Sequence, residues 1–489
     1  MENQLFIYNT LTKTKELFKQ LNPPFVGFYV CGPTVYSDVH LGNCRTFMSF
    51  DVMYRYLSFL GYKVRYVRNI TDAGHLESDG DVGEDKISKR AKLEQKEPME
   101  IVQHYTVDFR EVMKMFNISP PSIEPTATGH IVEQIEIAKK IIENGYAYEL
   151  NGTVYCDVEK LNKLYNYGQL SGRNLDDLLT NTRDLDGQDE KKGKLDFALW
   201  IKAKPEHLQQ WPSPWGMGFP GWHIECSAMS RKYLGEQFDI HGGGMDLVPT
   251  HHTNEIAQNM ASCGKGPANY WVHTNMLTVN GQKMSKSLGN SFLPHELFSG
   301  NHPLLEKGYS AMAVKFFMLQ THYSSTLDFS NEALQASEKG FARLMEAMKT
   351  LENLVPSALS SVDVKAIRTM CYEAMNDDFN TPILLAQLFE AVRVVNSVND
   401  KHETLKQDDI AVLKTLFADF VVNVLGLKQE ETNNKQTEVL DKVVKVVLDM
   451  RVSAKQNKDF KTSDELRDKL LSAGVTIKDG KEGSTWALS

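Results

Sequence analysis

The chain has 489 residues, of which 42% are hydrophobic and 24% charged, and this is the composition of a folded protein too long for one hydrophobic core. It has neither a basic head followed by an apolar stretch nor an apolar run of roughly 18 residues, so we expect no signal peptide and no membrane span. Six scattered cysteines argue against a disulfide framework, and a net charge of −9 argues only weakly against a nucleic-acid partner, because such binding depends on local basic faces.

The first predicted elements alternate between strand and helix. Residues 25–31 (FVGFYVC) form a short apolar run that stops at a Gly-Pro turn, which predicts a strand. Residues 43–60 have helical apolar spacing with Gly61 placed to end the helix, and residues 62–70 (YKVRYVRNI) predict a second strand. Strand, helix and strand in this order predict a parallel sheet that binds ligands at the carboxyl ends of its strands.

The middle of the chain, residues 120–212, is interpreted as an insertion into this sheet domain. It contains a helix at about 129–144, a β-like pair around 146–157 and a polar stretch at 173–194. The doubly wound pattern then resumes in four predicted elements: a helix from about His223, a strand ending at His241, a helix from about Thr250 and a strand near 270–274.

The last third of the chain is predicted to be helical. Helical patterning is almost continuous from residue 331 to 427, and the polar stretch KQEETNNKQTE follows as a linker. Two amphipathic helices at about 439–456 and 462–471 precede a short tail. Between residues 435 and 470 there are nine Lys/Arg and seven Asp/Glu, a local excess of two positive charges. This balance permits RNA binding, and a solvated helical face is the alternative.

A candidate metal site combines residues from distant segments. His251 and Glu255 are four apart on a predicted helix, so both side chains leave the same face. Cys226 lies 25 residues upstream and Cys31 ends the first strand, and the four are of types that zinc accepts. Spacing alone leaves open whether the cysteines are instead small core residues. It also leaves open two competing ligands, Cys44 and His252.

Two loops are candidates for binding phosphates. His40, Gly42 and Asn43 (HLGN) lie at the predicted start of a helix, where backbone N–H groups and the helix dipole favour anions. Alone this pattern is weak, because any strand-to-helix turn can contain a glycine. The pentapeptide KMSKS, with Lys283 and Lys286, is more specific, since two lysines and two hydroxyls on a Gly-flanked loop suit a mobile clamp over phosphates.

A third loop, residues 241–246 (HGGGMD), follows a predicted strand. Its three glycines let backbone approach a ligand closely, and Asp246 could accept a hydrogen bond from a ribose hydroxyl. A plain glycine-rich turn is the alternative.

Together these segments resemble the class I aminoacyl-tRNA synthetases and, closely, the cysteinyl-tRNA synthetases. The matching stretches are CGPTVYSDVHLGN, RYVRNITD, WPSPWGMGFPGWHIECSAMS, FDIHGGGMDL, HHTNEIAQ, KMSKSLGN and MNDDFNTP. The resemblance implies an α/β fold, with a Rossmann-type doubly wound parallel sheet, an inserted connective domain, a helical bundle and a small C-terminal anticodon-binding domain. The implied domains are 1–119 and 213–275 (the two halves of the sheet domain), 120–212 (connective insertion), 276–330 (KMSKS loop and stem contacts), 331–428 (tRNA-binding helical bundle) and 435–489 (anticodon binding).

The same resemblance implies a cysteine–tRNA ligase that uses ATP with Mg²⁺, binds tRNA(Cys) and holds one zinc ion that binds the thiolate of the substrate cysteine. The implied zinc ligands are Cys31, Cys226, His251 and Glu255. The implied catalytic residues are His40, Asn43, Lys283 and Lys286. ATP contacts are implied at His40, Gly42, Asn43, His241, Gly243, Asp246 and Lys286, the cysteine pocket at Thr71 and Trp222, and anticodon contacts at Phe460 and Asp464.

Three features depart from the family pattern, of which Val248-Pro249-Thr250, in place of the more usual Phe-Pro, is interpreted as a local change. Asn43 stands where the family more often has His, and because Asn cannot become cationic we expect weaker phosphate stabilisation there. The acidic loop 73–83 (AGHLESDGDVG) is absent from shorter relatives, and the sequence assigns it no role. We expect a cytoplasmic monomer without a membrane partner.

Three other functions compete with this interpretation. A synthetase for another amino acid would share the sheet and phosphate loops, but Cys31 and Cys226 disfavour it. A ligase joining cysteine to an amino-sugar would not need the residues after Thr437. A regulatory, non-enzymatic paralogue would not need an intact KMSKS and four metal ligands.

Overall fold

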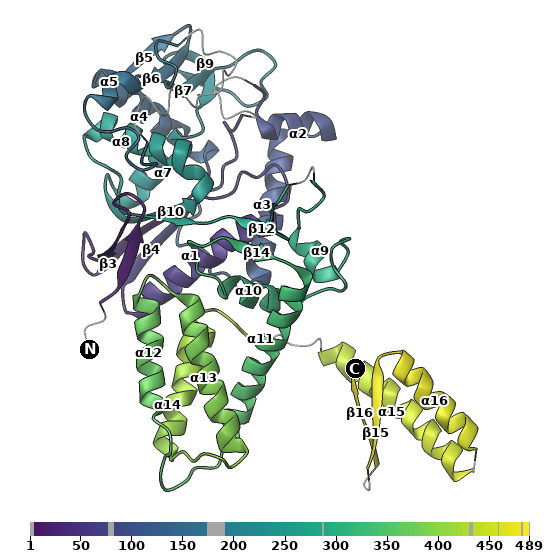
Figure 1. Ribbon diagram of the computed structural model, residues 1–489. Coiled ribbons are helices and arrows are strands. Elements are labelled where there is room, and N and C mark those ends of the chain that lie inside the picture. The colour runs from purple at the N-terminus through teal and green to yellow at the C-terminus, as the bar shows by residue number, and fades with distance from the viewer. Residues whose placement is uncertain are drawn as a thin grey trace. The chain divides into compact units, whose positions relative to one another are not determined.

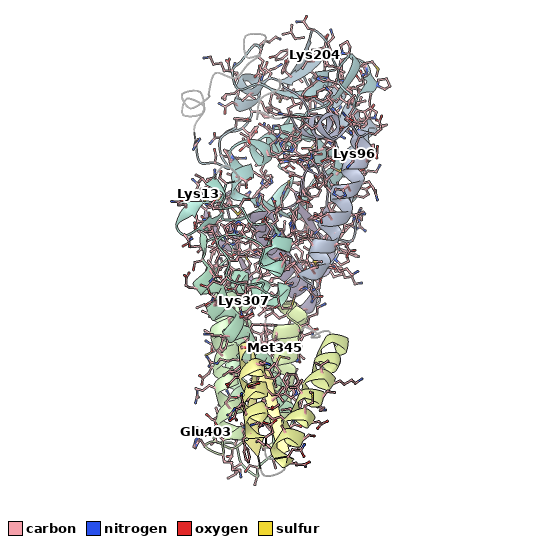
Figure 2. The ribbon with its side chains drawn as sticks, turned by 90° about the vertical axis from the view of Figure 1, so that its right-hand side faces the viewer. Lys13, Lys96, Lys204, Lys307, Met345 and Glu403 are labelled. Carbon is pink, nitrogen blue, oxygen red and sulfur yellow. The ribbon has the colours of Figure 1, made fainter. Side chains whose placement is uncertain are left out.

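The computed structural model describes residues 4–76, 83–173, 191–285, 288–429, 434–457, 459–480 and 483–488. They belong to two compact units, Met1–Lys428 and Gln429–Ser489. In the first unit Met345 is buried inside the helical part, whereas Lys13, Lys96 and Lys204 are exposed (Figure 2). Within the described ranges, no helix is both long and apolar enough to cross a membrane.

The first unit contains the parallel sheet that the sequence predicts. Its four strands are hydrogen-bonded in the order β11-β10-β3-β4, and all neighbours are parallel. Their bounds are β3 (Phe25–Val30), β4 (Lys63–Arg68), β10 (Phe238–Gly244) and β11 (Ala268–Thr274). Helix α1 (Leu41–Phe59) lies on one side of the sheet and α7 (Ile224–Leu234) on the other (Figure 1). Cover on both faces explains why β3 (FVGFYV) is an almost continuous apolar run.

Strand β10 continues past His241, where we expected it to end. Gly243 pairs with His273 of β11, and Gly244 pairs with Thr274. Glycine adopts extended backbone without a side chain to pack, so the triple-glycine run prolongs the sheet instead of turning away from it. The carboxyl ends of β3, β10 and β11 therefore lie at one edge.

Helix α1 begins at Leu41, two residues before the expected start. His40 is its N-cap: its Nδ1 lies 3.4 Å from the N–H of Asn43, and the Asn43 Oδ1 accepts a hydrogen bond from the N–H of His40 at 3.2 Å. This reciprocal capping box satisfies backbone donors that the first turn cannot pair. The HLGN signature therefore stabilises the start of this helix locally, in addition to any role toward a ligand.

The helix expected from Thr250 is also different in detail. A π-helical turn, Val248–His252, precedes helix α8 (Thr253–Cys263). Pro249 lies in the first turn, where its missing N–H leaves no helical hydrogen bond unmade. The wide turn buries both His251 and His252.

The inserted segment forms a five-stranded antiparallel sheet that the sequence only partly predicts. The strand order is β5-β6-β7-β9-β8, of which only the first pair was expected. The bounds are β5 (Ala147–Leu150), β6 (Thr153–Cys156), β7 (Phe197–Lys202), β8 (Trp211–Ser213) and β9 (Gly216–Pro220), packed with α4 (Ile131–Glu143) and α5 (Val158–Asn162). Glycine and proline in β8 and β9 mask their strand character, and the sheet runs on to Pro220. Most of the polar stretch 173–194, residues 174–190, lies outside the described residues.

The remaining elements of the first unit surround the sheet. A hairpin (β1, Phe6–Asn9; β2, Thr14–Leu17) begins the chain, and α2 (Lys86–Glu94) and α3 (Pro98–Met115) follow β4. A small sheet of β12 (Leu277–Val279), β13 (Gln282–Lys283) and β14 (Leu327–Phe329) holds the base of the KMSKS loop, with α9 (Pro294–Ser299) and α10 (Ala311–Leu319). The predicted helical region comprises α11 (Asn331–Glu352), α12 (Val364–Asn376), α13 (Thr381–Asn399), α14 (Gln407–Phe417) and a π-helical end, Ala418–Val424.

The second unit consists of two helices and a hairpin. Helices α15 (Asn434–Gln456) and α16 (Phe460–Ser472) are followed by β15 (Val475–Gly480) and β16 (Gly483–Leu488), which pair antiparallel. The sequence predicted only a short tail after the second helix and did not predict this hairpin. Val475 and Ile477 of the hairpin pack on Val444 and Leu448 of α15, because two helices alone leave these apolar faces uncovered.

Candidate metal centre and active site

Four side chains from three segments meet at the carboxyl edge of the parallel sheet. Cys31 directly follows β3, Cys226 lies in the first turn of α7, His251 lies in the π-helical turn and Glu255 in the first turn of α8. All four are buried. Among the described residues, their ligand atoms form a group in which every pair lies within 4.8 Å.

Four of the six donor–donor distances in this group match the edges of a tetrahedron around a small cation. Cys31 Sγ lies 3.7 Å from Cys226 Sγ and 3.6 Å from Glu255 Oε1. His251 Nε2 lies 3.4 Å from Cys226 Sγ and 3.3 Å from Glu255 Oε1. Zinc bonds of about 2.3 Å to sulfur and about 2.0 Å to nitrogen or oxygen require tetrahedral edges of about 3.8 Å between sulfurs and about 3.3 Å between N and O. The four donors fit zinc in type and in spacing.

A second group shares two of these residues. Cys31, His241, His252 and Glu255 also have ligand atoms within 4.8 Å of one another. Here His252 Nε2 lies 4.0 Å from Glu255 Oε1, while His241 Nε2 lies 2.8 Å from Glu255 Oε2, a hydrogen-bond distance. These two distances differ more from the edge of a zinc tetrahedron than the corresponding distances in the first group do. Cys44, the other competing thiol, is buried in the hydrophobic core on α1 and belongs to neither group.

Burial keeps the two thiols and the imidazole of the site in their neutral forms. Burial raises the pKa of Cys226 to about 12 and raises the pKa of Cys31 well above its usual value. Burial also holds the pKa of His251 well below its usual value, so its ring is neutral. A neutral imidazole beside two thiols and a carboxylate supplies no positive charge. A bound divalent cation would supply it and would favour both thiolates.

Sequence reasoning named His252 only as a competing ligand and missed His273, which forms a chain of histidines with it behind the site. Thr10 Oγ1 lies 2.8 Å from His273 Nδ1, and His273 Nε2 lies 2.8 Å from His252 Nδ1. His252 Nε2 then lies 3.3 Å from Cys31 Sγ. Hydrogen bonds of this kind orient metal ligands from outside the first layer of contacts. The available signal was the density of histidines in otherwise apolar segments.

The residues assigned to the cysteine pocket border this site. The indole of Trp222 lies 4.6 Å from the ring of His251, centroid to centroid. Thr71 follows β4, and its hydroxyl donates a hydrogen bond to Glu225 Oε1 at 2.5 Å. Glu225, which the sequence reasoning also missed, is buried, and burial raises the pKa of its carboxyl well above its usual value.

The phosphate-loop candidates lie close to one another. A Cβ added at Gly42 would lie 3.0 Å from the ring of His40 and 3.4 Å from the terminal methyl of Met284, so the HLGN and KMSKS segments are neighbours. Asn290 bridges the base of the KMSKS loop by accepting from the N–H of Ser285 at 2.8 Å and donating to the carbonyl of Lys283 at 3.2 Å. Lys286 lies outside the described residues.

The residues of the glycine loop at the end of β10 differ in their exposure to solvent. His241 is buried and stacks on Trp271 at 4.4 Å, Gly243 leaves no room for a Cβ beside the ring of His252, and Asp246 is exposed. In the second unit, Phe460 and Asp464 are both exposed on α16.

Family models match most of the chain. The model for the tRNA synthetases class I (C) catalytic domain matches residues 17–339, and the model for the DALR domain matches residues 371–429. Curated relatives match over their full length: a cysteine–tRNA ligase of Bacteroides fragilis is 58% identical, with 100% of both chains covered, and one of Porphyromonas gingivalis is 55% identical, also with 100% of both covered. A cysteine–tRNA ligase of Cytophaga hutchinsonii is 52% identical over 99% of each chain.

Solved structures show the same fold at low identity. The methionyl-tRNA synthetase of Mycobacterium tuberculosis in complex with methionyl-adenylate superposes with a TM-score of 0.57 at 13% identity, covering 82% of this chain and 89% of its own. The LeuRS of Agrobacterium radiobacter, in a ternary complex with tRNA, superposes with a TM-score of 0.58 at 12% identity, covering 83% and 85%. Both likenesses concern the fold alone.

Proposed function

The chain belongs to the class I aminoacyl-tRNA synthetases and, among them, to the cysteine–tRNA ligases, and we propose that the edge of its parallel sheet joins L-cysteine to tRNA(Cys) in two steps. The cysteine carboxylate attacks the α-phosphorus of ATP, which releases pyrophosphate and forms cysteinyl-adenylate. A ribose hydroxyl of the 3′-terminal adenosine of the tRNA then attacks the adenylate carbonyl and releases AMP.

The observation that carries this proposal is the buried donor set of Cys31, Cys226, His251 and Glu255. Two sulfurs, one nitrogen and one oxygen at tetrahedral spacings suit zinc, which is borderline-soft. When bound, zinc would supply a Lewis acid with a preference for thiolate over hydroxyl. The set thus accounts for discrimination between cysteine and serine, which differ by one atom and which shape alone separates only modestly.

The two phosphate signatures stabilise charge in the first step. His40, Gly42 and Asn43 lie at the N-terminus of α1, where the helix dipole favours the triphosphate, with Mg²⁺ accompanying ATP. Lys283 and Lys286 would neutralise the charge that develops on the departing pyrophosphate. The position of the Met284 methyl beside Gly42 supports a common site for the two signatures.

The remaining assignments complete the pocket and the tRNA contacts. We assign ATP contacts to His241, Gly243 and Asp246 at the end of β10, and the cysteine pocket to Thr71 and Trp222. We assign anticodon contacts to Phe460 and Asp464, since exposed aromatic and carboxylate groups on one helix can stack on unpaired bases and bind their edges. We further propose that the protein acts as a cytoplasmic monomer.

Exchange of labelled pyrophosphate into ATP tests the proposal. The expected result is exchange that depends on cysteine and is far weaker with serine or methionine. A synthetase for another amino acid would prefer that amino acid. An amino-sugar ligase would activate cysteine but would not charge tRNA(Cys), so charging is measured with the same preparation.

A further inference from the structure

The acidic loop 73–83, to which the sequence assigned no role, begins inside the candidate active site. Its first residues, 73–76, and the segment from residue 83 onward are described, whereas residues 77–82 are not. His75 is only 9% exposed, although an acidic sequence begins two residues later at Glu77. A buried histidine at the base of an acidic loop is unexpected unless its ring has a partner.

That partner is the indole of Trp222. The two rings stack with centroids 4.0 Å apart and planes inclined by 10°. The indole also lies 4.6 Å from the ring of His251. Trp222 therefore contacts both a histidine of the metal group and a histidine of the loop.

Hydrogen bonds hold the His75 ring in one orientation. Lys86 Nζ lies 2.6 Å from His75 Nε2, and the Thr34 hydroxyl lies 2.7 Å from His75 Nδ1. An ammonium group only donates, so Nε2 accepts and Nδ1 carries the hydrogen that it donates to Thr34. Burial and then the charge of Lys86 lower the pKa of His75 well below its usual value, in agreement with a neutral ring.

Contacts with the start of α2 and with the inserted sheet fix the backbone around His75. The N–H of His75 donates to Asp85 Oδ2 at 3.1 Å, and Asp85 in turn caps helix α2. Leu76 is buried among apolar residues of the inserted sheet, including Phe219. Gly74 has φ +74°, and a Cβ there would lie 2.5 Å from the carbonyl oxygen of Pro220. The loop base is wedged between the parallel sheet and the insertion.

We propose that the base of the 73–83 loop supplies His75 as a positioning residue, which holds the Trp222 indole against His251 and thereby shapes the pocket for the substrate cysteine. The inference rests on the proposed function, because it takes Trp222 to be part of the cysteine pocket. His75 acts through Trp222 and needs no contact with the reacting atoms. The described base of the loop, residues 73–76, then takes part in amino-acid recognition.

Three variants separate the stacking from the hydrogen bonds. His75→Ala removes both, His75→Phe keeps an aromatic face for Trp222, and Thr34→Val removes only the hydrogen bond to Nδ1. An offset aromatic stack corresponds to roughly a 2- to 12-fold change in an equilibrium constant. We therefore expect His75→Ala to raise KM for cysteine by about that factor in pyrophosphate exchange, with KM for ATP unchanged, and His75→Phe to restore most of it.

Tryptophan fluorescence gives a readout independent of turnover. The change that cysteine causes in the wild-type emission should be absent in Trp222→Phe and reduced in His75→Ala, at unchanged metal content. An unaltered KM for cysteine in His75→Ala, or failure of His75→Phe to restore it in a folded protein, would overturn the inference. Lack of cysteine-dependent exchange in the wild type would instead refute the proposed function, so the two failures are distinguishable.

Discussion

The two candidate metal groups share Cys31 and Glu255, and substitution of the unshared residues tells them apart. In the proposed set Cys226 and His251 are ligands, so Cys226→Ser and His251→Ala should each leave an incomplete site. In the other set His241 and His252 would take their places. We expect the Cys226 and His251 variants to lose bound zinc on dialysis against a chelator.

The size of the effect follows from the number of donors. A four-ligand structural zinc site contributes about 10–16 kcal/mol, so one ligand corresponds to about 3 kcal/mol, or roughly a 100-fold loss of affinity. His252 lies 3.3 Å from Cys31 Sγ and is oriented by His273, which makes it a partner of a ligand. Loss of such a partner weakens metal binding by roughly 10- to 100-fold. His252→Ala should therefore reduce zinc affinity by no more than Cys226→Ser or His251→Ala does.

Cobalt substitution makes the distinction independent of affinity. A cobalt ion bound by two thiolates has a stronger sulfur-to-metal charge-transfer band than an ion bound by one. Cys226→Ser should weaken that band to the level of one thiolate, whereas His252→Ala should leave it at the level of two. An unchanged band in Cys226→Ser would refute the reasoning from tetrahedral distances and favour the second group.

Three further predictions concern other parts of the chain. Lys286→Ala should slow adenylate formation far more than it weakens cysteine binding, because its charge matters as pyrophosphate departs; an unchanged pre-steady-state activation rate would remove it from the catalytic set. Cutting the chain near Thr437 should preserve cysteine-dependent exchange but steeply reduce charging of tRNA, because the second unit has its own core and carries the proposed anticodon contacts; equal charging would contradict that role. Burial lowers the pKa of Lys315 to about 8. The unfolded chain therefore binds the Lys315 proton more strongly than the folded chain does. As a result, the free energy of unfolding should rise by about 3 kcal/mol between about pH 8 and 10.5. Lys315→Met should lack that rise in urea titrations run at each pH, and identical pH profiles would show that Lys315 is not the cause.

Much of the fold was predictable because it depends on local pattern. The apolar runs at residues 25–31 and 62–70, separated by helical spacing, predicted a parallel sheet, and the sheet of β3 and β4 confirms it. The comparisons confirm the family that the motifs resembled. Local pattern failed where tertiary contacts decide the structure. The glycines that prolong β10 are extended because β11 pairs with them. Strands β15 and β16 form because they bury apolar side chains of α15.

The candidate site divides in the same way. The spacing of His251 and Glu255 alone indicated a shared helix face, because four residues make about one helical turn. No local pattern could choose between Cys226 and Cys44, since the choice depends on which helix packs beside the end of β3, and that requires the register of the sheet. The position of His75 against Trp222, two residues 147 apart in sequence, likewise depends on how the loop is wedged between the sheet and the insertion. Sequence thus determined which chemical groups are available and which neighbours share a face, while tertiary packing decided which distant groups meet, because only the folded chain brings them within bonding distance.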